Sequence, residues 1–308
     1  MKNFLFLIIF STSLFSAAQK ADSSSKPTAL REKAARLVSI AESNGYEKIS
    51  NISLKELAED IQKPSIINDD KSNTIGREGT RRDGQYYSGE NAAVHLSEKE
   101  NSKLNNETAA TLNLHELAGA SGYYDRNYAL SLQILYSSKT KTNQSTVTKD
   151  YIKKQNLKLE KSLKGGSGTS VGGGGDSDTI ELKILILNYL DTLKSSGIDF
   201  YEKTSLEKIA QITFECSFEF YDGAYAIFPE AYLKESYSGK DAPTRSILST
   251  SWAQVNIRRD WFKNPNVSPM DKINLLLKGI YPIAQLEQTV CDISKLQLND
   301  HKLLPRGK

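Results

Sequence analysis

The stretch Leu-His-Glu-Leu-Ala-Gly-Ala-Ser-Gly-Tyr-Tyr-Asp, residues 114–125, joins two predicted helices and sets the fold of the N-terminal part. Alanine and leucine recur at helical spacing before it, which predicts a helix over 106–118. Gly119 and Gly122 should end that helix, because glycine adopts a positive φ without a steric penalty. A second helix is expected over 127–137, and the aspartate that closes the stretch is well placed to cap it.

The composition is that of a globular protein with little excess charge. The 308 residues include 40 Lys and Arg and 37 Asp and Glu, which gives a formal net charge of +3. No basic stripe dominates, so nucleic acid is not an expected partner. The pairs Arg81-Arg82 and Arg258-Arg259 are expected on solvated surfaces.

The N-terminus resembles an export signal. Lys2 precedes a short apolar run at 4–10, and Ser16-Ala17-Ala18 supplies small residues for cleavage. We therefore predict a signal peptide over 1–18 and a mature protein in the periplasm or outside the cell. No later apolar run is long enough for a membrane span, so the chain is not expected to cross one. The sequence names no partner, and a protein or envelope component is the class that this location favours.

Two cysteines, Cys216 and Cys291, are the only ones in the chain. In an exported protein an even pair predicts a disulfide, and the alternative is two buried thiols. Closing so long a loop would stabilise the fold by about 4 kcal/mol in the chain-entropy model. With two Cys and three His, the usual ligand sets of a closed structural zinc site cannot be assembled.

A change in composition divides the chain into two parts. Residues 19–28 are polar and are expected to be disordered, and residues 29–160 should form an N-terminal α+β region. Within it, a helix is expected from Ala29, because apolar residues recur at helical spacing from Leu30 to Ala41. Ser53 should cap a short helix, and 85–87 should pair with 91–96 as strands. The glycine-rich stretch at 161–178 is predicted to be a linker or surface loop.

The C-terminal part, residues 179–308, is also predicted to be α+β. A long buried helix is expected over 179–195, and the alternating pattern over 212–220 predicts a strand that returns at 224–228. Another strand is expected over 251–257, and a last helix should begin near Ser268-Pro269. This part should therefore be an antiparallel meander packed by helices.

The spacing within the opening stretch matches most of a zinc-binding pattern, H-E-x-x-H-x-x-G-x-x-D. Residues four apart share one face of a helix, so two His at that spacing reach one ion, and the Glu acts as base on metal-bound water. His115 and Glu116 occupy the first-ligand and base positions, Gly122 the turn and Asp125 the third ligand. Gly119 stands where the second His would be, and it has no ligand atom.

The segment 86–131 resembles the active-site region of the metzincins and the wider zincin group. It also resembles uncharacterised exported bacterial proteins with a Leu-His-Glu-x-x-Gly-x-x-Gly-x-x-Asp-x-x-Tyr run, which residues 114–128 match as they stand. The resemblance implies a mainly helical, zincin-like N-terminal region with a short sheet. It also implies that His115 and Asp125 are metal ligands and that Glu116 is the catalytic base.

Three interpretations remain open at this point. The protein could be a non-catalytic, zincin-like binding or scaffolding protein, or a metal-dependent hydrolase that takes a third ligand from elsewhere, such as His95 or His301. In the third interpretation, His115 is a hydrogen-bonded helix residue and Asp125 caps the next helix. Because catalytic zinc takes three protein ligands, we expect no resident cofactor, and zinc is the one candidate.

Overall fold

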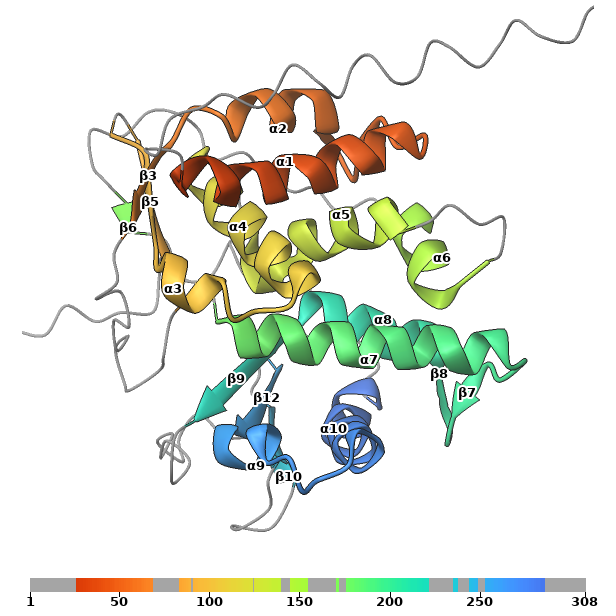
Figure 1. The fold of residues 1–308 in the computed structure, drawn as a ribbon. Coiled ribbons are helices and arrows are strands. Elements are labelled where there is room, and N and C mark those ends of the chain that lie inside the picture. The colour runs from red at the N-terminus through yellow and green to blue at the C-terminus, as the bar shows by residue number, and fades with distance from the viewer. Residues whose placement is uncertain are drawn as a thin grey trace, which may run out of the picture.

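The computed structural model shows an α+β protein in which helices hold most of the described residues and the strands are short (Figure 1). It describes residues 26–68, 83–89, 91–123, 125–139, 145–154, 170–171, 176–221, 235–237, 244–248 and 253–285. The predicted signal peptide, the expected return strand at 224–228, and Arg81, Arg82, Cys291 and His301 lie outside these residues.

The N-terminal part begins with two helices joined by a small hairpin. Its elements are α1 (Lys26–Ser43), β1 (Lys48–Ile49), β2 (Ile52–Ser53) and α2 (Leu54–Asp60). One stripe of α1 is buried, as its helical spacing predicts: Leu30, Ala34, Val38 and Ala41. The Ser53 side chain accepts a hydrogen bond from the Glu56 N–H at 3.4 Å, which confirms the predicted cap of α2.

A four-stranded sheet follows at one end of these helices. Its strands are β3 (Ser65–Asn68), β4 (Gly84–Ser88), β5 (Ala93–Leu96) and β6 (Ser170–Val171), in the order β3-β5-β4-β6. β4 pairs with β5 antiparallel, as predicted, and Tyr86 lies opposite Val94. β3 pairs with β5 in parallel.

Further helices form the layer below α1 in Figure 1. They are α3 (Glu98–Asn101), α4 (Asn106–Ala120), α5 (Ala129–Lys139) and α6 (Val147–Lys154), with a short 3-10 turn, η2 (Arg126–Tyr128), before α5. The two helices predicted on either side of the turn in residues 114–125 are therefore present. Gly119 lies inside α4 instead of ending it, and α5 begins two residues later than expected.

The C-terminal part begins with the same order of elements as the N-terminal part: a helix, a hairpin and a second helix. It begins with α7 (Ser177–Ser195), β7 (Phe200–Tyr201), β8 (Thr204–Ser205) and α8 (Leu206–Glu215). The long buried helix predicted over 179–195 is confirmed, and it begins two residues earlier, within the expected linker.

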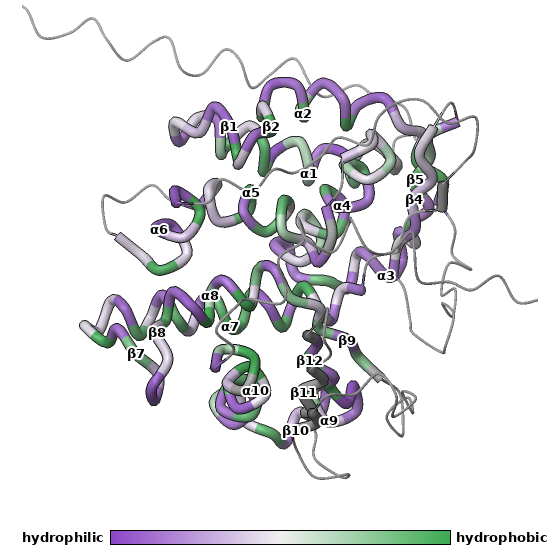
Figure 2. The backbone as a smooth tube through the Cα atoms, turned by 180° about the vertical axis from the view of Figure 1, so that it is seen from behind, coloured by the Kyte–Doolittle hydropathy of each residue, from purple (hydrophilic) through white to green (hydrophobic). Residues whose placement is uncertain are grey.

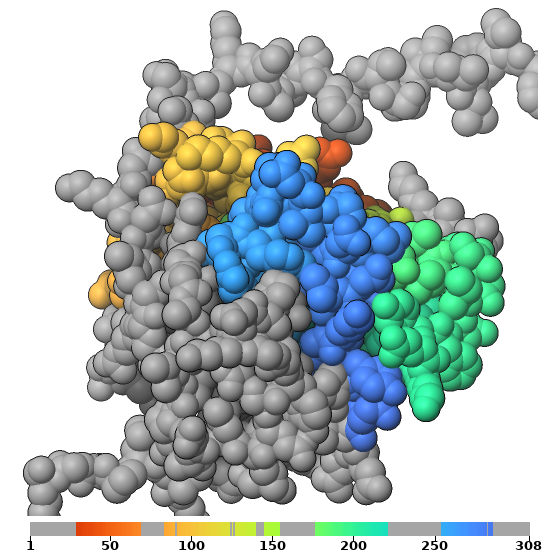
Figure 3. Space-filling view, turned by 90° about the horizontal axis from the view of Figure 1, so that it is seen from below, coloured from red at the N-terminus to blue at the C-terminus, as the bar shows by residue number. Residues whose placement is uncertain are grey.

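A second four-stranded sheet and two helices complete the described chain. The elements are β9 (Ser217–Tyr221), β10 (Glu235–Tyr237), β11 (Thr244–Leu248), β12 (Ala253–Arg258), α9 (Arg259–Lys263) and α10 (Pro269–Ala284). β10, β11 and β12 form an antiparallel meander, and β9 adds to β12 in parallel. Viewed from below, α9 and α10 (blue) lie beside the part that carries the β7–β8 hairpin (green, Figure 3).

Two local expectations were wrong for physical reasons. The strand predicted over 212–220 is half helix, because residues 212–215 end α8, which Ser205 caps by accepting from the Lys208 N–H at 3.2 Å. Residues 26–28, expected to be disordered, form the first turn of α1. Residues 212–215 fit both an alternating and a helical pattern, and the packing of the whole helix decides between them.

One hydrophobic core runs through both parts. It includes residues of α1, α4, α5, α7, α8, β9, β12 and α10. Figure 2 shows the outer helix α2 as mostly hydrophilic, in keeping with its place at the edge of the molecule. Among the described residues, no helix is both long enough and apolar enough to cross a membrane.

Candidate functional site

Helix α4 carries the His-Glu pair through the middle of the molecule. It lies between α1 and α7 and packs against β4 (Figure 1). Every residue from Thr108 to Ala120 is buried. Asn105 begins the helix by accepting a hydrogen bond from the Thr108 N–H at 2.9 Å. Any chemistry at His115, whose side chain keeps only 10% of its exposure, would take place in the protein interior.

His115 and Asp125 are brought together, as the spacing predicts, but they bind each other. Nδ1 of His115 lies 3.1 Å from Oδ2 of Asp125. The same carboxylate accepts the Leu130 N–H at 2.7 Å and the Ser131 N–H at 3.3 Å, so Asp125 caps the first turn of α5. Gly122 makes the turn between them with a φ of 87°, which glycine adopts cheaply.

The charge state of His115 follows from these contacts. Burial alone would lower its pKa, but the hydrogen bond and charge of Asp125, with the charge of Glu116, raise the pKa above the ordinary value. A histidine must be neutral to bind a metal. Asp125 and Glu116 favour the protonated form of His115, so they oppose metal binding as the pH falls.

Gly119, at the position of the missing second His, is covered by an aromatic ring. A Cβ atom added to Gly119 would lie 2.4 Å from Cε1 of Tyr86, a side chain of β4. No real Cβ sits so close to another carbon, so this helix position accepts glycine because the Tyr86 ring lies against its backbone. The space that a second metal-binding imidazole would need belongs to Tyr86.

This packing gives a direct prediction. Gly119→Ala should lower the free energy of unfolding by about 2 kcal/mol, because overpacking outweighs the roughly 1 kcal/mol by which alanine favours a helix. In a Tyr86→Leu background the same change should cost much less, which denaturant titration of the four proteins would show. If Gly119→Ala stabilises the protein with Tyr86 intact, the ring does not occupy this space.

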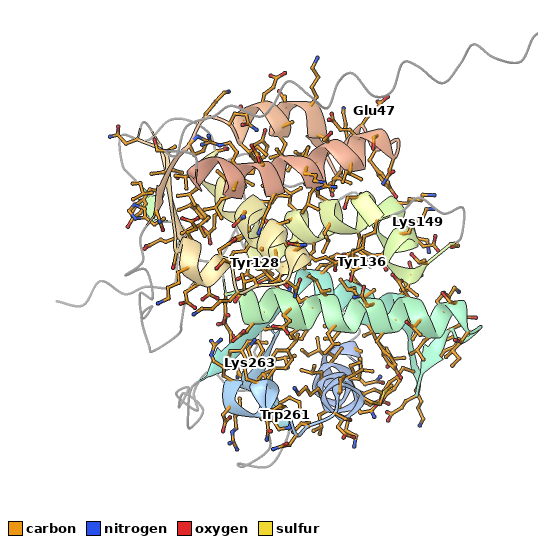
Figure 4. The ribbon with its side chains drawn as sticks, in the orientation of Figure 1. Glu47, Tyr128, Tyr136, Lys149, Trp261 and Lys263 are labelled. Atoms are coloured by element: carbon orange, nitrogen blue, oxygen red, sulfur yellow. The ribbon has the colours of Figure 1, made fainter. Side chains whose placement is uncertain are left out.

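Two tyrosines enclose the His115 ring. The ring centroids of Tyr86 and His115 are 6.2 Å apart with an interplanar angle of 77°, and those of His115 and Tyr128 are 4.5 Å apart at 50°. The Tyr128 hydroxyl also accepts the Asp176 N–H at 2.6 Å, at the start of α7. Tyr128 therefore links the His115 site to the C-terminal part, and it lies between α4 and α7 in Figure 4.

Glu116, the predicted catalytic base, is fully buried. It lies against the start of β4, where a Cβ added to Gly84 would be 2.8 Å from Oε1 of Glu116. Gly84 thus makes room for the carboxylate. A general base has to reach a proton on substrate or water, directly or through one water. The close packing against β4 gives Glu116 an interior position between helix and sheet.

Among the described residues, the donor groups around His115 do not supply the three ligands of a zinc site. A catalytic zinc ion takes three protein ligands that converge on one point. Here the two predicted ligands, His115 and Asp125, are hydrogen-bonded to each other, and Tyr86 fills the place next to them. His95 lies on β5 with its ring against Tyr87, at a centroid distance of 5.2 Å. Within the described ranges, no group of three or more His, Cys, Asp or Glu residues could hold a metal ion.

A second polar cluster, at the start of α7, was not predicted. Oδ2 of Asp83 accepts the Ser177 N–H at 2.9 Å and the Ser177 hydroxyl at 2.5 Å. Arg259 pairs with Asp176 at 3.0 Å and with Asp178. The surface position expected for Arg259 is therefore wrong, because these two carboxylates hold it in the interior. Burial and the neighbouring Asp83 and Asp178 raise the pKa of Asp176 to about 6, against the opposing effect of Arg259.

Lys183 is the most unusual buried group. It lies fully buried on α7, and its ammonium group donates to the carbonyl oxygens of Asn127 at 2.7 Å, Cys216 at 3.1 Å and Phe214 at 3.5 Å. These acceptors belong to the turn before α5 and to the end of α8. Burial lowers the pKa of Lys183 to about 7, although Asp125 and two nearby glutamates favour its charged form.

The predicted disulfide stays a prediction. Cys216 lies at the end of α8 and is 1% exposed. Its expected partner, Cys291, lies outside the described residues.

The fold and site define an α+β protein with a histidine–aspartate pair buried between two helix layers. Comparisons with protein-family models, with curated proteins and with solved structures each found no match.

Proposed function

We propose that this protein is an exported, zincin-like binding or scaffolding protein without peptidase activity, acting in the periplasm or outside the cell. The observation that carries the proposal is the Tyr86 ring against Gly119. In the corresponding place a zincin has its second metal-binding His. Here the place is filled by a side chain from the neighbouring sheet.

The hydrogen bonds of Asp125 support a fastening role for the retained motif. One carboxylate binds His115 on α4 and two backbone N–H groups at the start of α5. Tyr128 then continues the contact to α7. The motif residues hold the turn and the helices around it in one arrangement, which a binding protein needs for a defined surface.

The alternative is a metal-dependent hydrolase with His115 and Asp125 as ligands and Glu116 as base. That activity would require Asp125 to leave His115 and the start of α5. It would also require a third ligand near Tyr86. Each change breaks a buried contact, so the binding role is the better supported one.

Glu116→Gln separates the two functions, because it keeps the size of the side chain and removes its basicity. We expect this variant, exported at the wild-type level, to restore the full phenotype to a strain that lacks the gene. Exposed Glu42→Gln serves as the control. Loss of the phenotype in Glu116→Gln, with export and thermal unfolding unchanged, would contradict a non-catalytic role.

A further inference from the structure

We infer that the chain contains two copies of one structural unit, residues 26–101 and 177–263, and that the His115 site lies in the helices that join them. In each copy a long helix is followed by a hairpin whose strands have two residues each. A second helix, a sheet with parallel and antiparallel strands, and a short helix come next. Figure 1 shows α1 and α7 lying one above the other, with the two sheets at the same end of the molecule.

The hairpins of the two copies match residue by residue. β1 and β2 (Lys48–Ile49 and Ile52–Ser53) correspond to β7 and β8 (Phe200–Tyr201 and Thr204–Ser205). The spacing between counterparts is constant, since 197 less 45, 205 less 53 and 217 less 65 are each 152. No gap is needed from the end of the first helix to the start of the sheet.

Backbone conformation and hydrogen bonds agree in the same register. Gly45 and Gly197 follow the first helices with φ of 92° and 78°. At the hairpin tips, Ser50 and Glu202 have φ of 55° and 51°, a conformation uncommon for residues other than glycine.

The exit from each hairpin is closed in the same way. The Leu54 N–H donates to the Glu47 carbonyl at 3.1 Å, and the Leu206 N–H donates to the Asp199 carbonyl at 3.0 Å. Glu47 is labelled at this point in Figure 4. Identical residues stand where this geometry needs them: Gly45 and Gly197, Ser53 and Ser205, Leu54 and Leu206, Ala58 and Ala210.

Three strands of each sheet share one arrangement. Their orders are β3-β5-β4 and β9-β12-β11, in both cases with the first pair parallel and the second antiparallel. The fourth strands differ, since β6 comes from outside the first copy and β10 lies between β9 and β11 in the chain. A short helix follows the second strand of each order, α3 after β5 and α9 after β12. Two unrelated α+β segments would have no physical reason to share strand order, strand direction and hairpin register together.

The comparison of the copies locates the His115 site. α4 and α5 lie between the copies in the chain. Tyr86 of the first copy covers Gly119, and Asp176, directly before the second copy, binds Tyr128. The register pairs Tyr86 with Val94 in one sheet and Ser246 with Val255 in the other, so Ser246 is the counterpart of Tyr86. The aromatic cover of Gly119 therefore comes from a tyrosine of the first copy, and the second copy has a serine at that register position.

A segment exchange in the full chain tests the duplication. Residues 45–51 are replaced by the sequence of 197–203, with Ile49 kept because it is buried. We expect the thermal unfolding midpoint to stay within about 3 °C of wild type, since all backbone requirements are met. The control carries the same inserted residues in a scrambled order that moves the glycine, and it should unfold at a clearly lower temperature.

Matched single variants give a second readout. Ser50→Gly and Glu202→Gly should each raise the midpoint by about 2 °C, because both relieve a positive φ. Gly45→Ala and Gly197→Ala should each lower the unfolding midpoint, and by amounts similar to one another, because alanine is strained at a positive φ. An exchange as damaging as the scrambled control, or paired variants with opposite signs, would overturn the inference.

Discussion

Asp125→Ala should lower the free energy of unfolding by about 3 kcal/mol, the largest loss we expect from any single change at the site. The change removes the partner of His115 and leaves the N–H groups of Leu130 and Ser131 without their acceptor. It also leaves a buried imidazole beside Glu116 without its main charge partner. Urea titration followed by circular dichroism measures the loss.

Two comparison variants separate the causes. Asp125→Asn keeps one carbonyl acceptor for α5 and should cost about half as much. Asp199→Ala removes an exposed carboxylate paired with Lys194 and should change little, because surface ion pairs are screened by solvent. If Asp125→Ala is as mild as Asp199→Ala, Asp125 does not fasten α4 to α5.

Lys183 should make the stability of the protein rise with pH between about 7 and 10. In the folded protein Lys183 loses its proton near pH 7, whereas in the unfolded chain it keeps the proton up to its ordinary pKa near 10.4. Between these values the unfolded state binds more protons, so raising the pH favours folding. The expected gain is about 2–4 kcal/mol across this range.

Lys183→Met isolates this effect from the other groups that titrate. The difference in free energy of unfolding between wild type and Lys183→Met, measured by urea titration from pH 6.5 to 9.5, should move in favour of wild type as the pH rises. Lys278→Met, at an exposed position on α10, should show no such trend. A pH-independent difference for Lys183→Met would mean that its ammonium group titrates as in water.

Local signals in the sequence predicted much of the fold. The buried stripe of α1, the Ser53 cap and the β4–β5 pairing follow from spacing and capping chemistry within a few residues. The miss at α8 has a local cause, because residues 212–215 fit both an alternating and a helical pattern. The parallel pairing of β9 with β12 joins segments far apart in the chain, and no short window reveals it.

The candidate site was predictable only in part. The spacing from His115 to Asp125 correctly brought these two side chains together. The ring of Tyr86 reaches Gly119 from another strand, and Asp176 meets Tyr128 from another helix. Lys183 could have been singled out as the one cation on the buried face of an apolar helix, but its three carbonyl partners are set by tertiary packing.

The zinc content of the purified protein tests the central claim most directly. The wild-type protein is dialysed against zinc, then against buffer, and its zinc is measured per chain beside the His115→Ala variant. A folded protein with far less than one zinc per chain, and an unfolding midpoint unchanged by a chelator, is the predicted result. One zinc per chain that is lost in His115→Ala, with a lower midpoint after chelation, would contradict the account and favour the hydrolase.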